Sequence, residues 1–169
     1  MRSTVAKQLC ECERSGVGNS KKPDSLDWGL LAGSVGPRVR LLRNALSARS
    51  IAVSAPHGLP TGSLTVLSLV AANPGSSQTA LANRAGLNKS ALVGIIDQLE
   101  QRDLVTRDRS TTDRRRYGVT VTAEGERVMQ TLFAAVSREE QPIRDALGGA
   151  DMATLLALLD RAIGALETS

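Results

Sequence analysis

Aromatic residues, histidine and cysteine are all scarce in this chain of 169 residues. The aromatic share is 2%, so a core must be built from Leu, Val, Ile and Ala, which suits packed helices better than a β-sandwich. A single histidine, His57, and two cysteines leave too few soft ligands for a structural zinc site. No apolar run approaches the ~20 residues that a membrane helix needs, which excludes an integral membrane protein.

Motifs of catalysis are missing as well. The sequence has no glycine-rich phosphate loop, no H-x-x-x-H or paired-cysteine metal spacing, and no nucleophile that could work with its one histidine. We therefore predict that the chain is not an enzyme, that it has no catalytic or metal-ligating residues, and that it needs no cofactor.

Residues 1–25 predict a flexible N-terminal arm, because they are mixed in charge and show little periodicity. No apolar run of signal-peptide length follows Met1, so we expect a cytoplasmic protein in which Cys10 and Cys12 stay reduced. A thiol-based redox sensor that uses these two cysteines remains an alternative.

Two helices are expected in the next part of the chain. Apolar residues recur every three or four positions from Trp28 to Ile51, which predicts a helix with one apolar stripe that Gly36-Pro37 kinks or divides. A loop rich in glycine and proline follows over residues 54–63, and a short helix is expected from Leu64 to Ala72.

A pair of helices separated by a tight turn is predicted over residues 77–101. Ser77 is a good N-cap for a helix over residues 78–85, Gly86 suits a left-handed residue after it, and Asn88 caps the second helix.

The second helix of this pair has a polar face suited to the major groove of DNA. Its core positions follow helical spacing and are Leu92, Ile95, Ile96 and Leu99, which turns Ser90, Gly94, Asp97 and Gln101 outward with Val93 on the flank. The first turn, with Asn88, Lys89 and Ser90, would lie nearest the base edges and phosphates. An αα-hairpin that merely packs is the alternative.

A basic β-hairpin is predicted directly after the helix pair. One strand begins near Leu104, and alternation from Arg116 to Val121 predicts the returning strand. Between residues 107 and 116, five arginines face only Asp108 and Asp113, a density that suggests a polyanion partner. The predicted fold is therefore mainly α with a small β-hairpin wing, a winged helix-turn-helix in which the helix contacts the major groove and the hairpin arginines reach phosphates or the minor groove.

The hairpin also carries a family motif. Residues 113–122, DRRRYGVTVT, followed by Ala123-Glu124-Gly125, resemble the wing signature D-x-R-x-x-x-V-x-L-T of the MarR family of bacterial transcription regulators, with Val121 in place of leucine. The helix pair is similar too, through Leu81-Ala82, residues 86–90 and residues 96–100. The sequence departs from the family at Gly94, where a polar or basic residue is usual, and at Asp103, where a glycine usually leaves the helix. Aspartate tolerates the left-handed region better than most residues, so we expect this turn to survive.

The resemblance implies several roles. Asp113 would form an ion pair that orients the wing, and Arg115 with its neighbours would contact DNA. The sequence predicts a helix from Ala123 to about Glu140 that ends before Pro142, and then a final helix with a wide apolar stripe from Met152 to Leu166. By the resemblance, this final helix and the Trp28–Ile51 helix would form the bundle of a homodimer, which places two recognition helices about one DNA turn apart on a palindromic operator. A small aromatic or anionic effector would bind between the dimer helices and the DNA-binding lobe and release the DNA.

Four regions and two residue sets follow from these interpretations. The regions are the arm (1–25), an N-terminal dimerisation helix region (26–58), a winged helix-turn-helix DNA-binding region (59–122) and C-terminal dimerisation helices (123–169). The predicted DNA-binding residues are Ser77, Gln78, Asn88, Lys89, Ser90, Val93, Gly94, Arg107, Arg109, Arg114, Arg115 and Arg116. The predicted effector-binding residues are Trp28, Arg38, Arg40 and Arg43.

The predicted function is that of a dimeric, sequence-specific DNA-binding transcription regulator, a repressor released by a small molecule. The alternative from a different class is a winged-helix adaptor that binds a protein and not DNA.

Overall fold

The computed structural model describes residues 26–109 and 117–167, and the chain divides into two compact units at residues 38 and 39. The first unit contains a 3-10 helix, η1 (Gly29–Leu31), and the start of α2 (Val35–Ser54). The predicted apolar stripe is thus divided just before Gly36-Pro37, and the regular helix begins at Val35. Proline is favoured in the first turn of a helix because its missing N–H would have no partner there.

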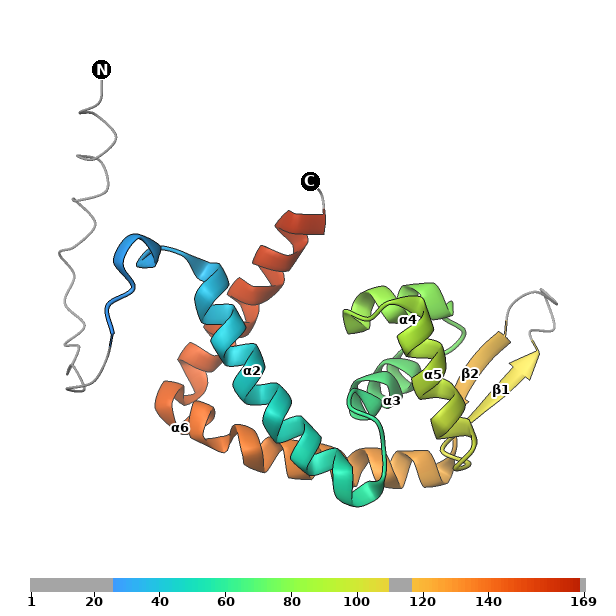
Figure 1. Cartoon of the computed structure of the whole chain (residues 1–169). Coiled ribbons are helices and arrows are strands. Elements are labelled where there is room, and N and C mark those ends of the chain that lie inside the picture. Colours follow the sequence, from blue (N-terminus) through green and yellow to red (C-terminus); the bar gives the residue numbers. More distant parts are fainter. Residues whose placement is uncertain (1–25, 110–116, 168–169) are drawn as a thin grey trace. The chain divides into compact units, whose positions relative to one another are not determined.

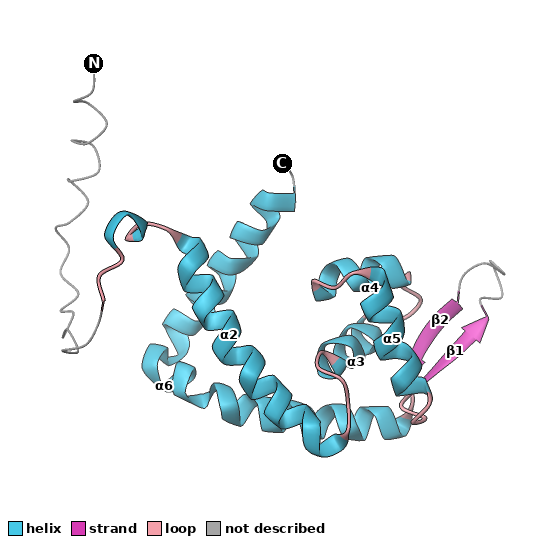
Figure 2. Ribbon diagram, viewed as in Figure 1, coloured by secondary structure: helices cyan, strands magenta, loops and turns pink. Residues whose placement is uncertain are grey.

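The second unit holds the remainder of α2 and all later elements (Figures 1 and 2). These are η2 (Ala55–His57), α3 (Ser63–Ala72), α4 (Gln78–Ala85), α5 (Lys89–Glu100), β1 (Val105–Arg109), β2 (Tyr117–Val121) and α6 (Ala123–Glu167). Helix α3 packs against α4, α5, α6 and β2, and the two strands form an antiparallel hairpin in which Val105 pairs with Val121. The prediction of a mainly helical winged helix-turn-helix fold is confirmed.

The core of the second unit is aliphatic. Leu67, Leu92, Ile96, Leu99 and Leu132 are completely buried and come from α3, α5 and α6. The four positions that the helical spacing of α5 placed in the core are all buried, which fixes the opposite side of this helix toward solvent. His57 is exposed at the end of η2.

The long C-terminal helix α6 breaks at a different place from the one predicted. Pro142 lies inside a helical stretch, and the backbone leaves helical geometry at Gly148, where φ is 70° and ψ is 174°. The sequence placed the break at Pro142, which is wrong. A proline removes only one helical hydrogen bond and can be accommodated by bending, whereas the conformation at residue 148 is open almost solely to glycine.

None of the helices over residues 26–109 and 117–167 is both long and apolar enough to cross a membrane.

Candidate nucleic-acid interface

The helix pair α4–α5 is held by two side-chain caps and one tight turn. The Ala80 N–H donates to Ser77 Oγ at 3.1 Å, and the Ala91 N–H donates to Asn88 Oδ1 at 2.8 Å. Gly86 ends α4 in the left-handed region at φ 65°, where a residue with a side chain is strained. The two caps and the turn were predicted from the sequence and are confirmed.

The first turn of α5 forms an exposed polar surface. Asn88, Lys89 and Ser90 are all exposed, and the Ser90 hydroxyl donates to Asn88 Oδ1 at 2.8 Å. One turn later, a Cβ added at Gly94 would have no heavy atom within 4 Å. Because no atom of the described residues would meet a side chain at this position, a DNA backbone or base edge can approach the helix closely here.

The other predicted contact residues are only partly described by the structure. Ser77 is exposed at the start of α4, and Gln78 and Val93 are half-buried. Residues Asp113, Arg114, Arg115 and Arg116 lie outside the described residues, as do Cys10 and Cys12, and for Arg109 only the backbone, in β1, is described.

Arg107 ties the first strand of the hairpin to the second helix of the pair. Its Nη1 lies 3.0 Å from Glu100 Oε2, and its Nη2 donates to Asp97 Oδ1. The Arg107 side chain is 24% exposed, and its buried Nε has no hydrogen-bond partner among the described residues. The sequence set Arg107 among arginines facing only Asp108 and Asp113, but the structure gives it two carboxylates of α5 as partners.

The base of the hairpin is closed by a turn that starts at Asp103. This residue has φ 56°, and it is the one residue other than glycine with positive φ in the described part of the chain. Leu104 O accepts from the Thr122 N–H at 3.0 Å, and Asp103 O accepts from the Thr122 hydroxyl at 2.6 Å. The expectation that aspartate can replace the usual glycine in this turn is confirmed.

The four residues predicted to bind an effector are divided between the two units, with Trp28 and Arg38 in the first and Arg40 and Arg43 in the second. In the first unit, the Arg38 guanidinium lies 5.0 Å from the centre of the Trp28 ring and donates to Ser34 O at 2.8 Å. Arg40 and Arg43 are exposed on α2, where Arg43 donates to Asn44 Oδ1 at 3.4 Å.

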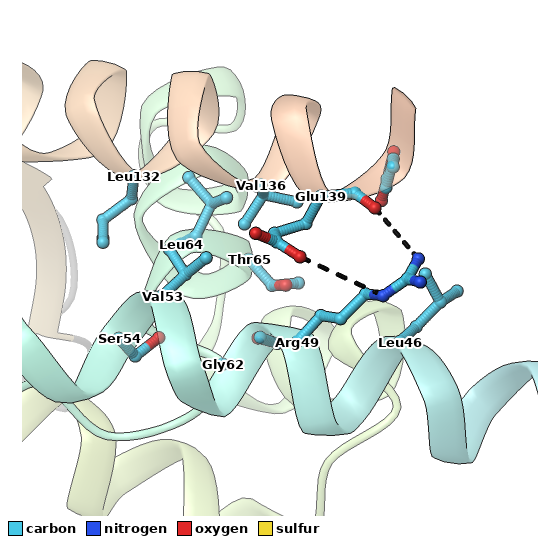
Figure 3. A pocket seen from close by; sticks show the side chains of 12 residues that line it. Leu46, Arg49, Val53, Ser54, Gly62, Leu64, Thr65, Leu132, Val136 and Glu139 are labelled. Carbon is cyan, nitrogen blue, oxygen red and sulfur yellow. Dashed lines mark hydrogen bonds and ion pairs between the residues drawn. The ribbon is translucent and has the colours of Figure 1, made fainter. Parts of the chain in front are cut away.

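A cavity of about 200 Å³ lies between α2, α3 and α6, and sequence reasoning missed it (Figure 3). None of the four predicted effector residues lines it. The lining residues are Leu46, Arg49, Ser50, Val53, Ser54, Gly62, Leu64, Thr65, Leu132, Val136, Glu139 and Glu140. They come from three separate stretches of chain, so no local spacing in the sequence could have brought them together.

Many large apolar side chains in the helices outside the helix pair are exposed. On α2 they include Val39, Leu41, Leu42 and Ile51, and on the last part of α6 they are Leu156, Leu158, Ile163 and Leu166. Leu166 is 81% exposed and Leu156 55%. Large apolar side chains left exposed along two helices favour a protein interface there.

Comparison with known proteins places these features in a family. The MarR family model matches residues 59–117. A protein of Thauera aromatica named as a transcriptional regulatory protein for the hcr operon is 36% identical over 136 residues, which cover 79% of this chain and 81% of that protein.

Two solved structures share the fold. The structure of the transcriptional repressor CouR bound to a 23-mer DNA duplex has 28% sequence identity and a TM-score of 0.72, and covers 82% of this chain and 99% of CouR. The structure of the regulator PcaV from Streptomyces coelicolor in complex with its natural ligand has 26% identity and a TM-score of 0.67, and covers 84% of this chain and 98% of PcaV.

Proposed function

This chain belongs to the MarR family of transcription regulators, and on that premise we propose that it is a homodimeric repressor of a palindromic DNA operator, released by a small effector. Members of the family are generally transcription factors without enzymatic activity. Because its target is the chromosome, we place the protein in the cytoplasm.

The exposed first turn of α5 carries the proposal. It combines a helix N-terminus, whose free N–H groups and dipole favour phosphate, with a lysine and small polar side chains that can approach base edges. The same helix is fixed on its other side by four buried aliphatic residues, so it is presented rigidly. The related repressor CouR is described as bound to a DNA duplex, which supports the same use of this fold here.

The proposed DNA contacts fall into two groups. The first lies on the helix pair and comprises Ser77, Gln78, Asn88, Lys89, Ser90, Val93 and Gly94. The second comprises the hairpin arginines Arg109, Arg114, Arg115 and Arg116, with Asp113 orienting the wing. We propose that Arg107 positions the hairpin through Asp97 and Glu100 and does not itself contact DNA.

The homodimer is supported by the exposed apolar side chains of α2 and the end of α6. A second copy would cover both stretches, and a two-fold axis would place two α5 helices on successive major grooves. Release by an effector is supported by the ligand complex of PcaV and by the cavity next to α2 and α6.

A mobility shift tests DNA binding, using a site mapped by pulling down and sequencing bound genomic fragments. Ser90→Glu puts a carboxylate beside phosphates and base edges, so it should abolish binding while the protein stays folded. The matched control is Gln130→Glu, which adds the same charge at an exposed position of α6. If Ser90→Glu bound the site as tightly as the control, α5 would not be the helix in the groove.

The same assay distinguishes a DNA-binding regulator from a protein adaptor. Phosphate contacts make affinity fall steeply with salt, by about 0.9 units of log affinity per unit of log salt for each phosphate. An adaptor would show no specific shift and no such slope.

Light scattering at micromolar concentration tests the assembly, and twice the chain mass of 17.8 kDa is expected. A monomer would contradict the proposed dimer.

A further inference from the structure

The linker between α2 and α3, residues 55–62, is held in place by its own hydrogen bonds. The Leu59 N–H donates to Ser54 O at 3.3 Å, and the Ser63 hydroxyl donates to Pro60 O at 2.7 Å. Ser54, Leu59 and Ser63 are buried. The linker is therefore anchored in the core at both ends, and it is not a free loop despite its glycines and prolines.

The second helix of the pair contacts this linker at two places, about two helical turns apart. Arg102, just past the end of α5, donates from Nη1 to His57 O at 3.0 Å. Its guanidinium also lies against Gly58, where an added Cβ would be 3.1 Å from Nη2. At the other place, Ile95 Cδ1 lies 3.4 Å from a Cβ built on Gly62. The linker thus follows α5 from its middle to its end.

The turn that carries Arg102 joins α5, the hairpin and α6. Asp103 O accepts from the Thr122 hydroxyl at 2.6 Å, and Leu104 O accepts from the Thr122 N–H at 3.0 Å. At the start of α6, the Gly125 N–H donates to Thr122 Oγ1 at 3.0 Å. Because these bonds fix the turn, the Arg102 side chain ties the linker to α5 and to the base of the hairpin together.

We propose that Arg102 is a positioning residue that fixes α5 and the hairpin relative to the end of α2, and that it thereby makes the protein strict about the spacing of its two operator half-sites. The inference rests on the proposed function, because α2 carries part of the proposed dimer surface and the half-site spacing follows from the separation of two α5 helices. One added base pair moves a half-site by about 3.4 Å and turns it by about 34°. A helix held at one angle to α2 cannot follow that change, whereas a helix without the tether can.

A direct phosphate contact is the competing role for Arg102, because its side chain is exposed. Its place in the fold argues against that role. The first turn of α5, which we propose to enter the groove, lies at the other end of a helix of 12 residues, about 18 Å away. The two roles also differ in their salt dependence, since a phosphate contact adds about one unit to the salt slope and a contact within the protein adds none.

Mobility shifts on the mapped operator, and on the same DNA with one base pair inserted between the half-sites, separate these roles. Arg102→Met keeps an apolar stem and removes the donors, whereas Arg102→Lys keeps the charge and a donor. The matched control is Arg127→Ala, which removes the same charge from a side chain whose described partners, Glu124 and Ala123 O, lie in its own helix.

The preference for the original spacing should fall at least about threefold in Arg102→Met, because an exposed hydrogen bond from a charged donor contributes only a few-fold factor. The salt slope should not change. Arg102→Lys and Arg127→Ala should keep the preference of the unsubstituted protein. Equal loss of affinity for both DNAs in Arg102→Met, with a slope lower by about one unit, would make Arg102 a phosphate contact and overturn the proposal.

Hydrogen exchange on the full chain without DNA tests the tether alone. Arg102→Met should speed exchange of the Leu59 N–H at least about threefold, and Arg102→Lys and Arg127→Ala should not. Exchange as slow in Arg102→Met as in the control would overturn the proposal, because the linker would then be held without Arg102. If the unsubstituted chain gave no operator shift, the proposed function and the spacing role would both fail, while the exchange result would still show whether Arg102 holds the linker.

Discussion

Gly125 offers the sharpest test of how the hairpin is joined to α6. A Cβ built on this residue would lie 2.0 Å from Leu104 O and 2.7 Å from Val121 Cγ1. Leu104 O is not free to move aside, because it accepts the Thr122 N–H at 3.0 Å at the base of the hairpin. The Gly125 N–H itself donates to Thr122 Oγ1 at 3.0 Å, which holds the glycine against that carbonyl.

Two opposing effects set the expected change in the free energy of unfolding for Gly125→Ala. Replacing glycine by alanine inside a helix ordinarily stabilises by about 0.5–1 kcal/mol. Inserting a methyl group into a packed region costs about 1–3 kcal/mol, and here the obstacle is backbone, which cannot change rotamer. The cost should lie near the upper end of its range, so we expect Gly125→Ala to lower the free energy of unfolding by about 2 kcal/mol. For a chain of this size, that loss lowers Tm by about 4–8 °C.

Gly94→Ala is the matched control. Gly94 is also helical, but a Cβ there meets nothing within 4 Å, so alanine should raise the free energy of unfolding by about 0.5–1 kcal/mol. Denaturant unfolding at one fixed protein concentration measures both variants, since dimerisation makes apparent stability depend on concentration. A Gly125→Ala protein as stable as Gly94→Ala would refute the claim that α6 packs backbone to backbone on the hairpin.

Three further predictions concern the interface. Asp103→Gly should raise unfolding free energy by about 0.4–1 kcal/mol in the same assay, because φ is 56° there; a loss would mean that the aspartate side chain itself stabilises the turn. Ser77→Ala should lower the free energy of unfolding by about 1 kcal/mol, because the hydrogen bond from the Ala80 N–H to the capping side chain is lost. Ser77→Asn should keep the stability of the unsubstituted protein, because asparagine is also a good N-cap. Arg107→Ala should weaken operator binding with the salt slope unchanged, whereas Arg115→Ala should lower that slope by about one unit; equal effects on the slope would make Arg107 a phosphate contact.

The features predicted correctly from the sequence are those with short-range causes. The caps at Ser77 and Asn88, the left-handed turn at Gly86 and the buried face of α5 each follow from residues within about two helical turns. The positive φ at Asp103 was expected from one residue's tolerance of that conformation. Such local signals predict the order of the helices and strands along the chain. The wing motif in residues 113–122 then indicated the MarR family.

The features that sequence reasoning missed depend on which segments meet in space. The cavity joins α2, α3 and α6, and the role of Gly125 depends on the carbonyl of Leu104, more than twenty positions earlier in the chain. The break in α6 was misplaced because proline at 142 is the stronger sequence signal, although a glycine can take conformations that a proline cannot.

The arginines near the hairpin show why charge density alone does not define an interface. One guanidinium with two carboxylate partners adds no net positive charge to the surface, because Asp97 and Glu100 outweigh Arg107. Both acids lie on the same helix whose first turn we propose to enter the groove, at its other end, so the pairing keeps their charge away from phosphate. We therefore propose that Arg107 serves DNA binding by pairing with these acids and fixing the hairpin. On this hypothesis the attraction for DNA comes from Lys89 and from the hairpin arginines that follow Arg107.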